Sequence, residues 1–125
     1  MLNDMFEMSN VLMEVDINLI RNKECESCTG INQGTKTNYH DQITESMLCA
    51  MDLGEDSCQG DSGGPLMLKS SQSADVHVGM VLWGMGCTHK DFPGVYTHIS
   101  SAYDWIRELT CRRSVSPQAD FWCDD

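Results

Sequence analysis

Basic side chains are scarce in this sequence. Only 8 lysines and arginines stand against 19 aspartates and glutamates, which gives a formal net charge of −11 at pH 7. A surface of that sign repels phosphate groups, so binding to nucleic acid or to an anionic membrane is disfavoured. Long apolar runs are lacking as well. The longest apolar stretch, around residues 80–83, is far short of the roughly 20 residues that span a membrane as a helix.

A secretory leader is also not evident. Asp4 and Glu7 stand where a signal peptide needs a basic stretch followed by an apolar one. The seven cysteines, however, are heavy usage for 125 residues and predict a disulfide framework formed in an oxidising compartment. These two observations agree if the chain is incomplete and a targeting segment lies upstream, which is what we expect.

Alternating and turn-rich stretches predict one all-β domain. Residues 11–20 alternate apolar and polar side chains, as a strand with one solvated face does. Two further strands are predicted at 65–69 and 76–83, joined by a polar turn, and another at 94–97. Residues 29–42 are polar and contain two glycines, which favours a loop.

Two helical segments are predicted. Residues 22–28 are suited to a short helical turn. A longer helix begins near Ser101, because Ser101 and Asp104 three residues later have the pattern of an N-cap and its partner. One face of this helix is apolar, and its members are Ala102, Trp105, Ile106 and Leu109.

The chemistry is concentrated in residues 56–65, which have the sequence DSCQGDSGGP. Two later blocks agree with it in order: WGMGC at 83–87, and PGVYT at 93–97 followed by YDWI at 103–106. Together they resemble the nucleophile loop, the wall of the primary specificity pocket and the closing strand and helix of the trypsin-like serine proteases. The segments at 12–25 and 47–50 also fit.

This resemblance covers residues 11 to about 110, which correspond to the second of the family's two β-barrels. It implies an all-β fold: the second six-stranded antiparallel β-barrel of the chymotrypsin/trypsin fold, followed by a C-terminal α-helix. We therefore expect a poorly ordered segment at 1–10, the barrel and helix at 11–110, and a C-terminal tail at 111–125.

Two motifs in the sequence also fit other classes of protein. The spacing of Gly60, Ser62 and Gly64 also fits the nucleophile elbow of α/β-hydrolases, but that motif needs a helix directly after it, where this sequence predicts a strand. Cys25 and Cys28 are spaced as half of a zinc site or as a redox pair. No second pair at zinc spacing accompanies them in the sequence.

The resemblance implies a role for each site residue. Ser62 is the nucleophile, and the backbone N–H groups of Gly60 and Ser62 form the oxyanion hole. Asp61 orders the oxyanion loop by pairing with the N-terminus that zymogen cleavage releases. Asp56 lies at the floor of the pocket and pairs with an Arg or Lys side chain. The substrate-binding set as a whole is Asp56, Ser57, Gln59, Trp83, Gly84 and Gly94; no cofactor and no metal is implied.

The resemblance also implies two disulfides, Cys25–Cys49 and Cys58–Cys87. Cys28, Cys111 and Cys123 remain, and an odd count leaves at least one free or intermolecular thiol. Cys111 and Cys123 close a short loop and are the candidates for a third bridge.

The partners that the serine needs are missing. The mechanism requires a histidine base and a carboxylate, which in this family come from the first barrel. The four histidines lack the family's Ala-His-Cys context, so each is expected to be a surface or structural residue: His40, His77, His89 and His98. Leu82 and Leu68 replace the family's usual serine and cysteine. The sequence also contains no activation site of the Ile-Val-Gly-Gly type, so we expect this chain to supply no new N-terminal ammonium group for Asp61.

The expected function is that of a serine-type endopeptidase, cleaving after Arg or Lys in the complete protein, with this chain inactive by itself. The alternatives are a non-catalytic protease homologue that binds a partner through the pocket, and an inactive truncated product. Expected partners are protein or peptide substrates, the missing N-terminal barrel and serine protease inhibitors, but no nucleic acid. The family and the cysteines indicate an extracellular location, secreted or tethered to a membrane.

Overall fold

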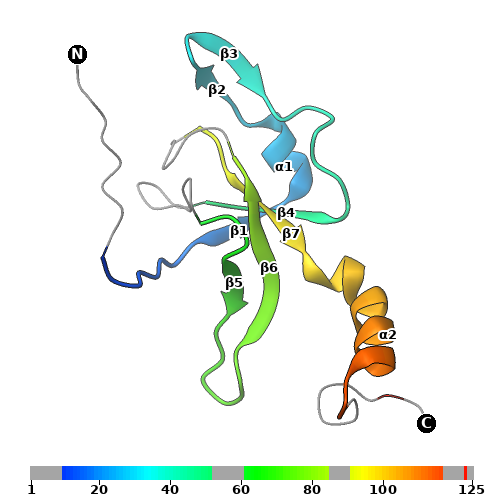
Figure 1. The fold of residues 1–125 in the computed structure, drawn as a ribbon. Helices are drawn as coiled ribbons and strands as arrows, with labels where there is room; N and C mark the ends of the chain where they lie inside the picture. The colour runs from blue at the N-terminus through cyan, green and yellow to red at the C-terminus, as the bar shows by residue number, and fades with distance from the viewer. Residues whose placement is uncertain (1–9, 52–60, 85–90, 117–122, 124–125) are drawn as a thin grey trace.

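The computed structural model describes residues 10–51, 61–84, 91–116 and 123 (Figure 1). Within these ranges the chain forms strands, two α-helices and one 3-10 turn. In chain order the elements are β1 (Asn18–Ile20), α1 (Asn22–Ser27), β2 (Thr29–Asn32), β3 (Thr35–Asn38), β4 (Met47–Met51), β5 (Pro65–Leu68), β6 (Val76–Trp83), β7 (Gly94–His98), η1 (Ile99–Ala102) and α2 (Tyr103–Arg113).

Five of the strands form one antiparallel sheet in the order β1-β4-β7-β6-β5. The central strand β7 begins with the buried residues Gly94, Val95 and Tyr96, as expected for a strand with neighbours on both sides. The long strand β6 pairs with β7 through a bulge between Val81 and Trp83. The all-β class with a C-terminal helix is confirmed, and the strands predicted at 65–69, 76–83 and 94–97 are present as β5, β6 and β7.

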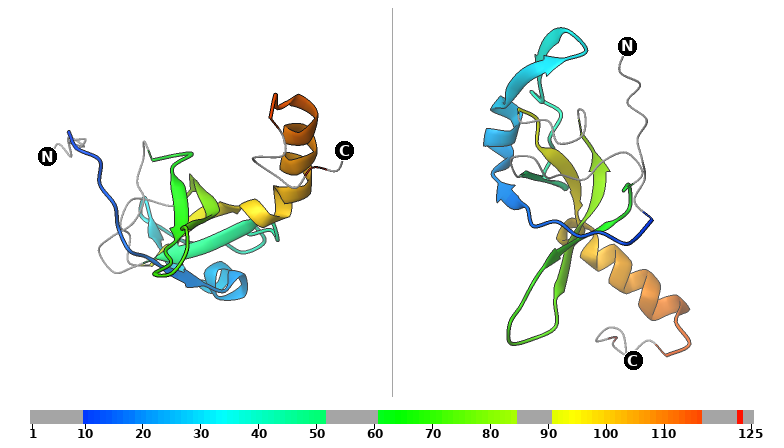
Figure 2. Two further views of the ribbon diagram at one scale, coloured as in Figure 1. Left: turned by 90° about the horizontal axis from the view of Figure 1, so that it is seen from below. Right: turned by 90° about the vertical axis from the view of Figure 1, so that its left-hand side faces the viewer.

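The prediction of a loop over residues 29–42 was wrong. Strands β2 and β3 pair there as an antiparallel hairpin. Gln33 and Gly34 form its turn with φ values of 50° and 80°, and positive φ at both central residues is typical of the type I′ turn that suits a two-residue hairpin. The hairpin and α2 extend from opposite ends of the sheet (Figures 1 and 2).

The strand predicted over residues 11–20 is much shorter than expected. Only Asn18–Ile20 pairs with β4, while the alternating apolar residues before it stay exposed, Met13 at 70% and Val15 at 41%. Lys69 links this segment to the end of β5 through Glu14, with 3.2 Å between Lys69 Nζ and Glu14 Oε1. That hydrogen bond raises the pKa of the Lys69 ammonium. Alternation alone therefore predicted more pairing than the sheet provides.

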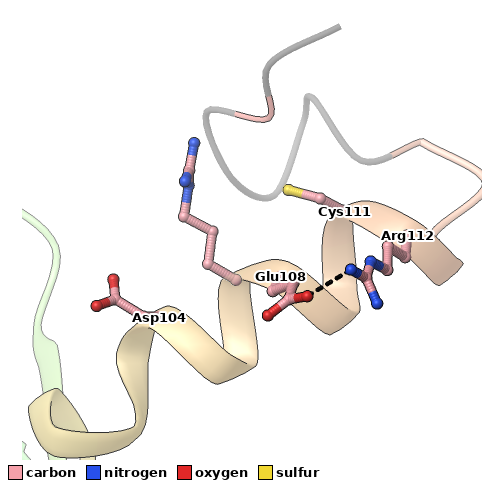
Figure 3. Close-up of a pocket in the computed structure, with 5 residues that line it drawn as sticks. Asp104, Glu108, Cys111 and Arg112 are labelled. Atoms are coloured by element: carbon pink, nitrogen blue, oxygen red, sulfur yellow. Dashed lines mark ion pairs between the residues drawn. The ribbon is translucent and has the colours of Figure 1, made fainter.

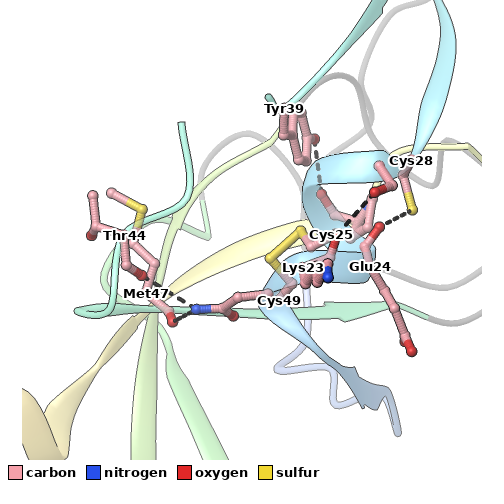
Figure 4. The surroundings of a disulfide bond; sticks show 11 residues. Lys23, Glu24, Cys25, Cys28, Tyr39, Thr44, Met47 and Cys49 are labelled. Carbon is pink, nitrogen blue, oxygen red and sulfur yellow. Dashed lines mark hydrogen bonds between the residues drawn. A yellow bond between two sulfur atoms is a disulfide. The ribbon is translucent and has the colours of Figure 1, made fainter. Parts of the chain in front are cut away.

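The core lies between α1, the end of the hairpin and the centre of the sheet. Its buried members are Cys25, Tyr39, Ile43, Cys49, Phe92 and Val95. The implied disulfide Cys25–Cys49 is confirmed and ties α1 to β4 (Figure 4). Asn22 reinforces the same junction, because its amide donates hydrogen bonds to the carbonyl oxygens of Thr44, at 3.3 Å, and Met47, at 3.0 Å.

Cys28, at the end of α1, carries the free thiol among the described cysteines. Its Sγ donates a hydrogen bond to the Glu24 carbonyl oxygen at 3.3 Å (Figure 4). Partial burial and the nearby carboxylates of Glu24 and Asp91 raise the pKa of this thiol, because both effects disfavour the thiolate.

The C-terminal helix is confirmed, but its predicted N-cap is wrong. Ala102 occupies the cap position, and the Ser101 hydroxyl donates instead to the His98 carbonyl oxygen at 2.6 Å. The apolar face is only partly covered by the described residues: Trp105 is 64% exposed, whereas Ala102, Ile106 and Leu109 are half-buried. Cys111 and Cys123 form a disulfide, as predicted. No helix among the described residues is both long enough and apolar enough to cross a membrane.

Candidate active site

Ser62 lies in a tight turn over residues 61–64 that precedes β5. The Gly64 N–H donates to the Asp61 carbonyl oxygen at 2.8 Å, which closes the turn. The Gly63 N–H donates to the Val81 carbonyl oxygen at 2.9 Å, and the Val81 N–H donates to the Gly64 carbonyl oxygen, also at 2.9 Å. The turn is therefore fixed to β6 by two hydrogen bonds, and it presents Asp61 and Ser62 at the surface, where both are exposed.

Glycine is required at both positions after the serine. Gly63 has a φ of +83°, which L side chains rarely adopt. A Cβ on Gly64 would lie 2.8 Å from the Asp61 carbonyl oxygen, the same atom that the Gly64 N–H needs as its acceptor. The two glycines thus permit a turn that places a serine at an exposed, well-defined point of the backbone.

A second feature lies where β6 ends and β7 begins. A Cβ on Gly84 would lie 3.7 Å from both the Gly94 Cα and the Pro93 carbonyl oxygen, so the two glycines that the resemblance assigns to the pocket wall are adjacent. Trp83 packs edge-on against Tyr39, with 4.9 Å between ring centroids. The structure therefore brings Trp83, Gly84 and Gly94 together.

One strand carries both features. Val81 in β6 holds the 61–64 turn, and Trp83 follows it at the end of the same strand. Across the bulge Val81 pairs with Tyr96 and Trp83 with Val95. Because Val81 and Trp83 belong to the same hydrogen-bonded ladder, the position of Ser62 relative to the wall is fixed by backbone structure.

Comparison with known proteins agrees with this geometry. The family model described as Trypsin matches residues 3–106. The chain belongs to the trypsin family. It is 39% identical to the clotting factor G beta subunit of Tachypleus tridentatus over 113 residues, 88% of this chain and 36% of that protein. It is also 39% identical to trypsin delta of Drosophila melanogaster over 95 residues, 76% of this chain and 33% of that protein. Hypodermin-B of Hypoderma lineatum shows 39% identity over 97 residues, 78% of this chain and 33% of that protein.

The chain thus spans about a third of the length of these curated relatives. It is a partial, C-terminal trypsin-like sequence with the half-barrel and helix of that fold. Other residues assigned to the site lie outside the described residues, namely Asp56, Ser57, Gln59 and Gly60, as does the Cys58–Cys87 pair. The roles of these residues stay predictions, as do the roles assigned to Ser62, Asp61, Trp83, Gly84 and Gly94.

The described histidines of this trypsin-family chain lie in other settings. His40 forms an exposed contact with Asp41, 3.3 Å between Nε2 and Oδ2. A hydrogen bond of 2.7 Å joins His98 Nε2 to Ser100 Oγ, and His77 is exposed on β6. In the parts of the chain that the structure describes, no histidine hydrogen bonds to Ser62. His89 lies outside those parts.

A hollow of about 390 Å³ lies elsewhere, along α2 (Figure 3). Its lining is Asp104, Arg107, Glu108, Cys111 and Arg112. The Arg112 guanidinium pairs with the Glu108 carboxylate at 2.6 Å, one turn away on the same helix. The lining balances two acidic with two basic side chains and contains none of the residues assigned to the trypsin-like site. Among the described residues, no cluster of three or more potential metal ligands is present.

Tyr39 lies beside Trp83, Pro93 and Gly84 and was not among the site residues predicted from the sequence. It is fully buried, and its hydroxyl donates to the Pro93 carbonyl oxygen at 2.9 Å across 54 positions of sequence. The signal in the sequence is weak, because Tyr39 is a single aromatic residue within the polar stretch 29–42, whose composition favours a loop.

Proposed function

We propose that this chain supplies the nucleophile and the primary specificity pocket of a trypsin-like serine endopeptidase that cleaves after arginine or lysine. The observation that carries the proposal is the attachment of the 61–64 turn to Val81, close along β6 to the wall at Trp83 and Gly84. A protease needs its nucleophile and its specificity pocket in a fixed relation, because the scissile bond lies next to the side chain that the pocket selects.

In the proposed mechanism Ser62 attacks the substrate carbonyl. The backbone N–H groups of Gly60 and Ser62 stabilise the negative charge that develops on the carbonyl oxygen. A serine hydroxyl is a weak nucleophile at neutral pH unless a base takes its proton. The base and the carboxylate that orients it are therefore supplied by the first barrel of the complete protein, and Asp61 orders the oxyanion loop in the activated form.

Specificity is proposed to come from Asp56 at the pocket floor, with Ser57 and Gln59 beside it. Gly84 and Gly94 lie against one another without side chains, which leaves space for the stem of a long cationic residue. Leaving one partner of a buried charge pair without its counterpart costs about 2–5 kcal/mol. At tenfold per 1.4 kcal/mol, this cost corresponds to a preference for arginine and lysine over apolar residues of about 30-fold to several thousandfold.

The proposed partners follow from this activity: protein or peptide substrates with Arg or Lys at the cleaved position, serine protease inhibitors that occupy the same pocket, and the first barrel. The disulfides Cys25–Cys49 and Cys111–Cys123 support an extracellular location, where such bonds persist.

A second candidate function is that of a non-catalytic homologue which keeps the pocket for binding. Leu82 favours it, because this apolar side chain is 40% exposed beside the wall where the family usually has a serine. A leucine there offers no hydroxyl to a catalytic carboxylate.

The test is hydrolysis of an arginine ester by the complete protein, by its Ser62→Ala variant and by a matched Ser71→Ala variant in the exposed β5–β6 turn. The enzyme proposal predicts that Ser62→Ala abolishes turnover and that Ser71→Ala does not. Turnover that survives in Ser62→Ala would contradict it. An inactive wild type that still binds benzamidine through Asp56 would favour the non-catalytic homologue.

A further inference from the structure

A serine and a histidine outside the candidate active site form a hydrogen-bonded pair where β7 ends. His98 is the last residue of β7, and Ser100 lies in η1, the 3-10 turn that leads into α2 (Figure 1). The distance from Ser100 Oγ to His98 Nε2 is 2.7 Å. Neither residue belongs to the set assigned to the trypsin-like site, so the mechanism proposed above does not use this pair.

Backbone hydrogen bonds hold both members of the pair. The His98 N–H donates to the Ser46 carbonyl oxygen at 2.7 Å, and the His98 carbonyl oxygen accepts from the Ser101 hydroxyl at 2.6 Å. The Ser100 carbonyl oxygen accepts from the Tyr103 N–H at the end of η1. The backbone segments that carry the hydroxyl and the imidazole are therefore fixed relative to one another, as a nucleophile and its base require.

The partner of the Ser100 hydroxyl differs in kind from the partners of other described hydroxyl groups. Ser27 donates to the Lys23 carbonyl oxygen, and Ser101 donates to the His98 carbonyl oxygen. A carbonyl oxygen accepts a hydrogen bond without taking the proton, whereas neutral imidazole is a base near neutral pH. Ser100 is also exposed, so a small acyl donor can reach its hydroxyl.

We propose that Ser100 is an acylation site with His98 as its general base, and that its acyl donors are activated carboxylic esters. When the imidazole is neutral and carries its proton on Nδ1, Nε2 accepts the hydrogen bond that the Ser100 hydroxyl donates. As Ser100 Oγ bonds to the acyl carbon, its proton passes to His98 Nε2, and the bond between the acyl carbon and the leaving oxygen breaks. The imidazolium returns the proton to the leaving group. The products are O-acyl Ser100 and a free alcohol or phenol.

The chemistry of the pair restricts the acyl donor to esters with a good leaving group. The hydroxyl and the imidazole supply a nucleophile and a base, but not an oxyanion hole, of which a single donor contributes about 10²–10³-fold in acyl transfer. The donor must therefore bring its own activation, as aryl esters do. Amides and peptide bonds are not donors for this site.

The test is acetylation of the full chain by p-nitrophenyl acetate, followed by peptide mapping with fragmentation that separates Ser100 from Ser101. Ser101 is the matched control, because it is an adjacent exposed serine whose hydroxyl faces a carbonyl oxygen. We expect Ser100 to be acetylated about a hundredfold faster than Ser101, the lower end of the gain from a positioned base. Hydroxylamine should remove the acetyl group, since it cleaves esters and leaves acetylated lysine intact.

Two variants test the role of the imidazole. His98→Gln keeps a side chain that can accept a hydrogen bond but removes the base, so acetylation of Ser100 should fall to the rate at Ser101. Ser101→Ala should leave the rate at Ser100 within about twofold of wild type, as exposed substitutions do. Equal rates at the two serines of the wild-type chain, or an unchanged rate at Ser100 in His98→Gln, would overturn the proposal.

Release of p-nitrophenolate gives a second measurement, which identifies the nucleophile. If His98 attacked the ester itself, the acetylimidazole would hydrolyse, and the release that His98→Gln abolishes would persist in Ser100→Ala. We expect Ser100→Ala to abolish that same part of the release, and its persistence would overturn the assignment of Ser100. Peptide mapping separates this adduct from one on Ser62, so the outcome does not depend on the proposed protease function.

Discussion

The 61–64 turn makes a direct prediction for alanine at Gly63. The residue has a φ of +83°, and an added Cβ would meet nothing within 4 Å. The cost is therefore backbone strain alone, about 1–2 kcal/mol for an L residue in the left-handed region. Gly34 is a matched control, because it has a φ of +80° and equally open surroundings in the β2–β3 turn.

Gly63→Ala and Gly34→Ala should therefore lower the free energy of unfolding by similar amounts. Gly64→Ala should cost more, about 2–4 kcal/mol, because its Cβ would lie 2.8 Å from a backbone oxygen and overpacking adds to the loss of a hydrogen bond. Urea denaturation followed by circular dichroism measures all three variants.

The relative losses of unfolding free energy in these three variants test the geometry of the 61–64 turn. If Gly34→Ala destabilises the chain and Gly63→Ala does not, the left-handed conformation assigned to Gly63 is wrong. If Gly64→Ala is as mild as Gly63→Ala, the 61–64 turn is not closed on the Asp61 carbonyl. Either result would remove the geometric basis for placing Ser62.

Three further predictions concern the scaffold. Replacing Cys25 and Cys49 by alanine should lower the free energy of unfolding by about 3 kcal/mol, because the bridge closes a separation of 24 residues and restricts the unfolded chain; urea denaturation that shows no loss would contradict this. The raised pKa of Cys28 predicts slower alkylation by iodoacetamide near pH 8.5 in the folded than in the unfolded chain, with Glu24→Gln accelerating it. Because the folded pKa of the thiol lies above the unfolded one, the stability that the protonated thiol contributes is present below the unfolded pKa and is lost as pH rises through the folded pKa. Equal alkylation rates in the folded and unfolded chains would refute the argument from burial and charge. Trp105→Ala should change the stability of the full chain by no more than about 0.5 kcal/mol, since the side chain is 64% exposed and exposed substitutions have small effects; a larger loss would show that this face is covered.

The sequence correctly predicted those strands whose pattern of apolar residues is matched by neighbouring strands in the sheet. Strands β6 and β7 alternate or bury their apolar residues, and both have neighbours on each side in the sheet. Residues 11–17 have the same alternation but no place in the ladder, because pairing with β4 begins at Asn18. Alternation of apolar and polar residues indicates a strand with one solvent-exposed face, but it does not indicate whether a partner strand is present.

The β2–β3 hairpin could not be predicted from apolar alternation. Its strands consist of threonine, asparagine, lysine and one glycine around one exposed isoleucine. The signal that was present is Gly34 in the turn, since glycine favours the positive φ that a two-residue hairpin needs. The prediction of Ser101 as the N-cap of α2 was wrong for a related reason. A 3-10 turn precedes the helix, and within it the Ser101 hydroxyl donates to the His98 carbonyl oxygen.

The candidate site shows the same difference between residues that a local sequence pattern predicts and residues that depend on distant partners. Ser62 and the glycines around it were assigned through resemblance to a contiguous motif, and the structure shows the tight turn that such neighbouring residues form. Gly84 and Gly94 were assigned through resemblance, and the structure shows them adjacent. Tyr39 was not found, because its role depends on a hydrogen bond to a residue 54 positions away, which no local pattern encodes.

The most direct test of the central claim is to map the covalent adduct that a fluorophosphonate probe forms with the complete protein. Such probes react with a serine whose hydroxyl is activated by a neighbouring base and whose adduct is held in an oxyanion hole. The account predicts a phosphonylated peptide containing Ser62 and no labelling of the Ser62→Ala variant. A probe adduct on another serine, with Ser62 unmodified, would contradict it.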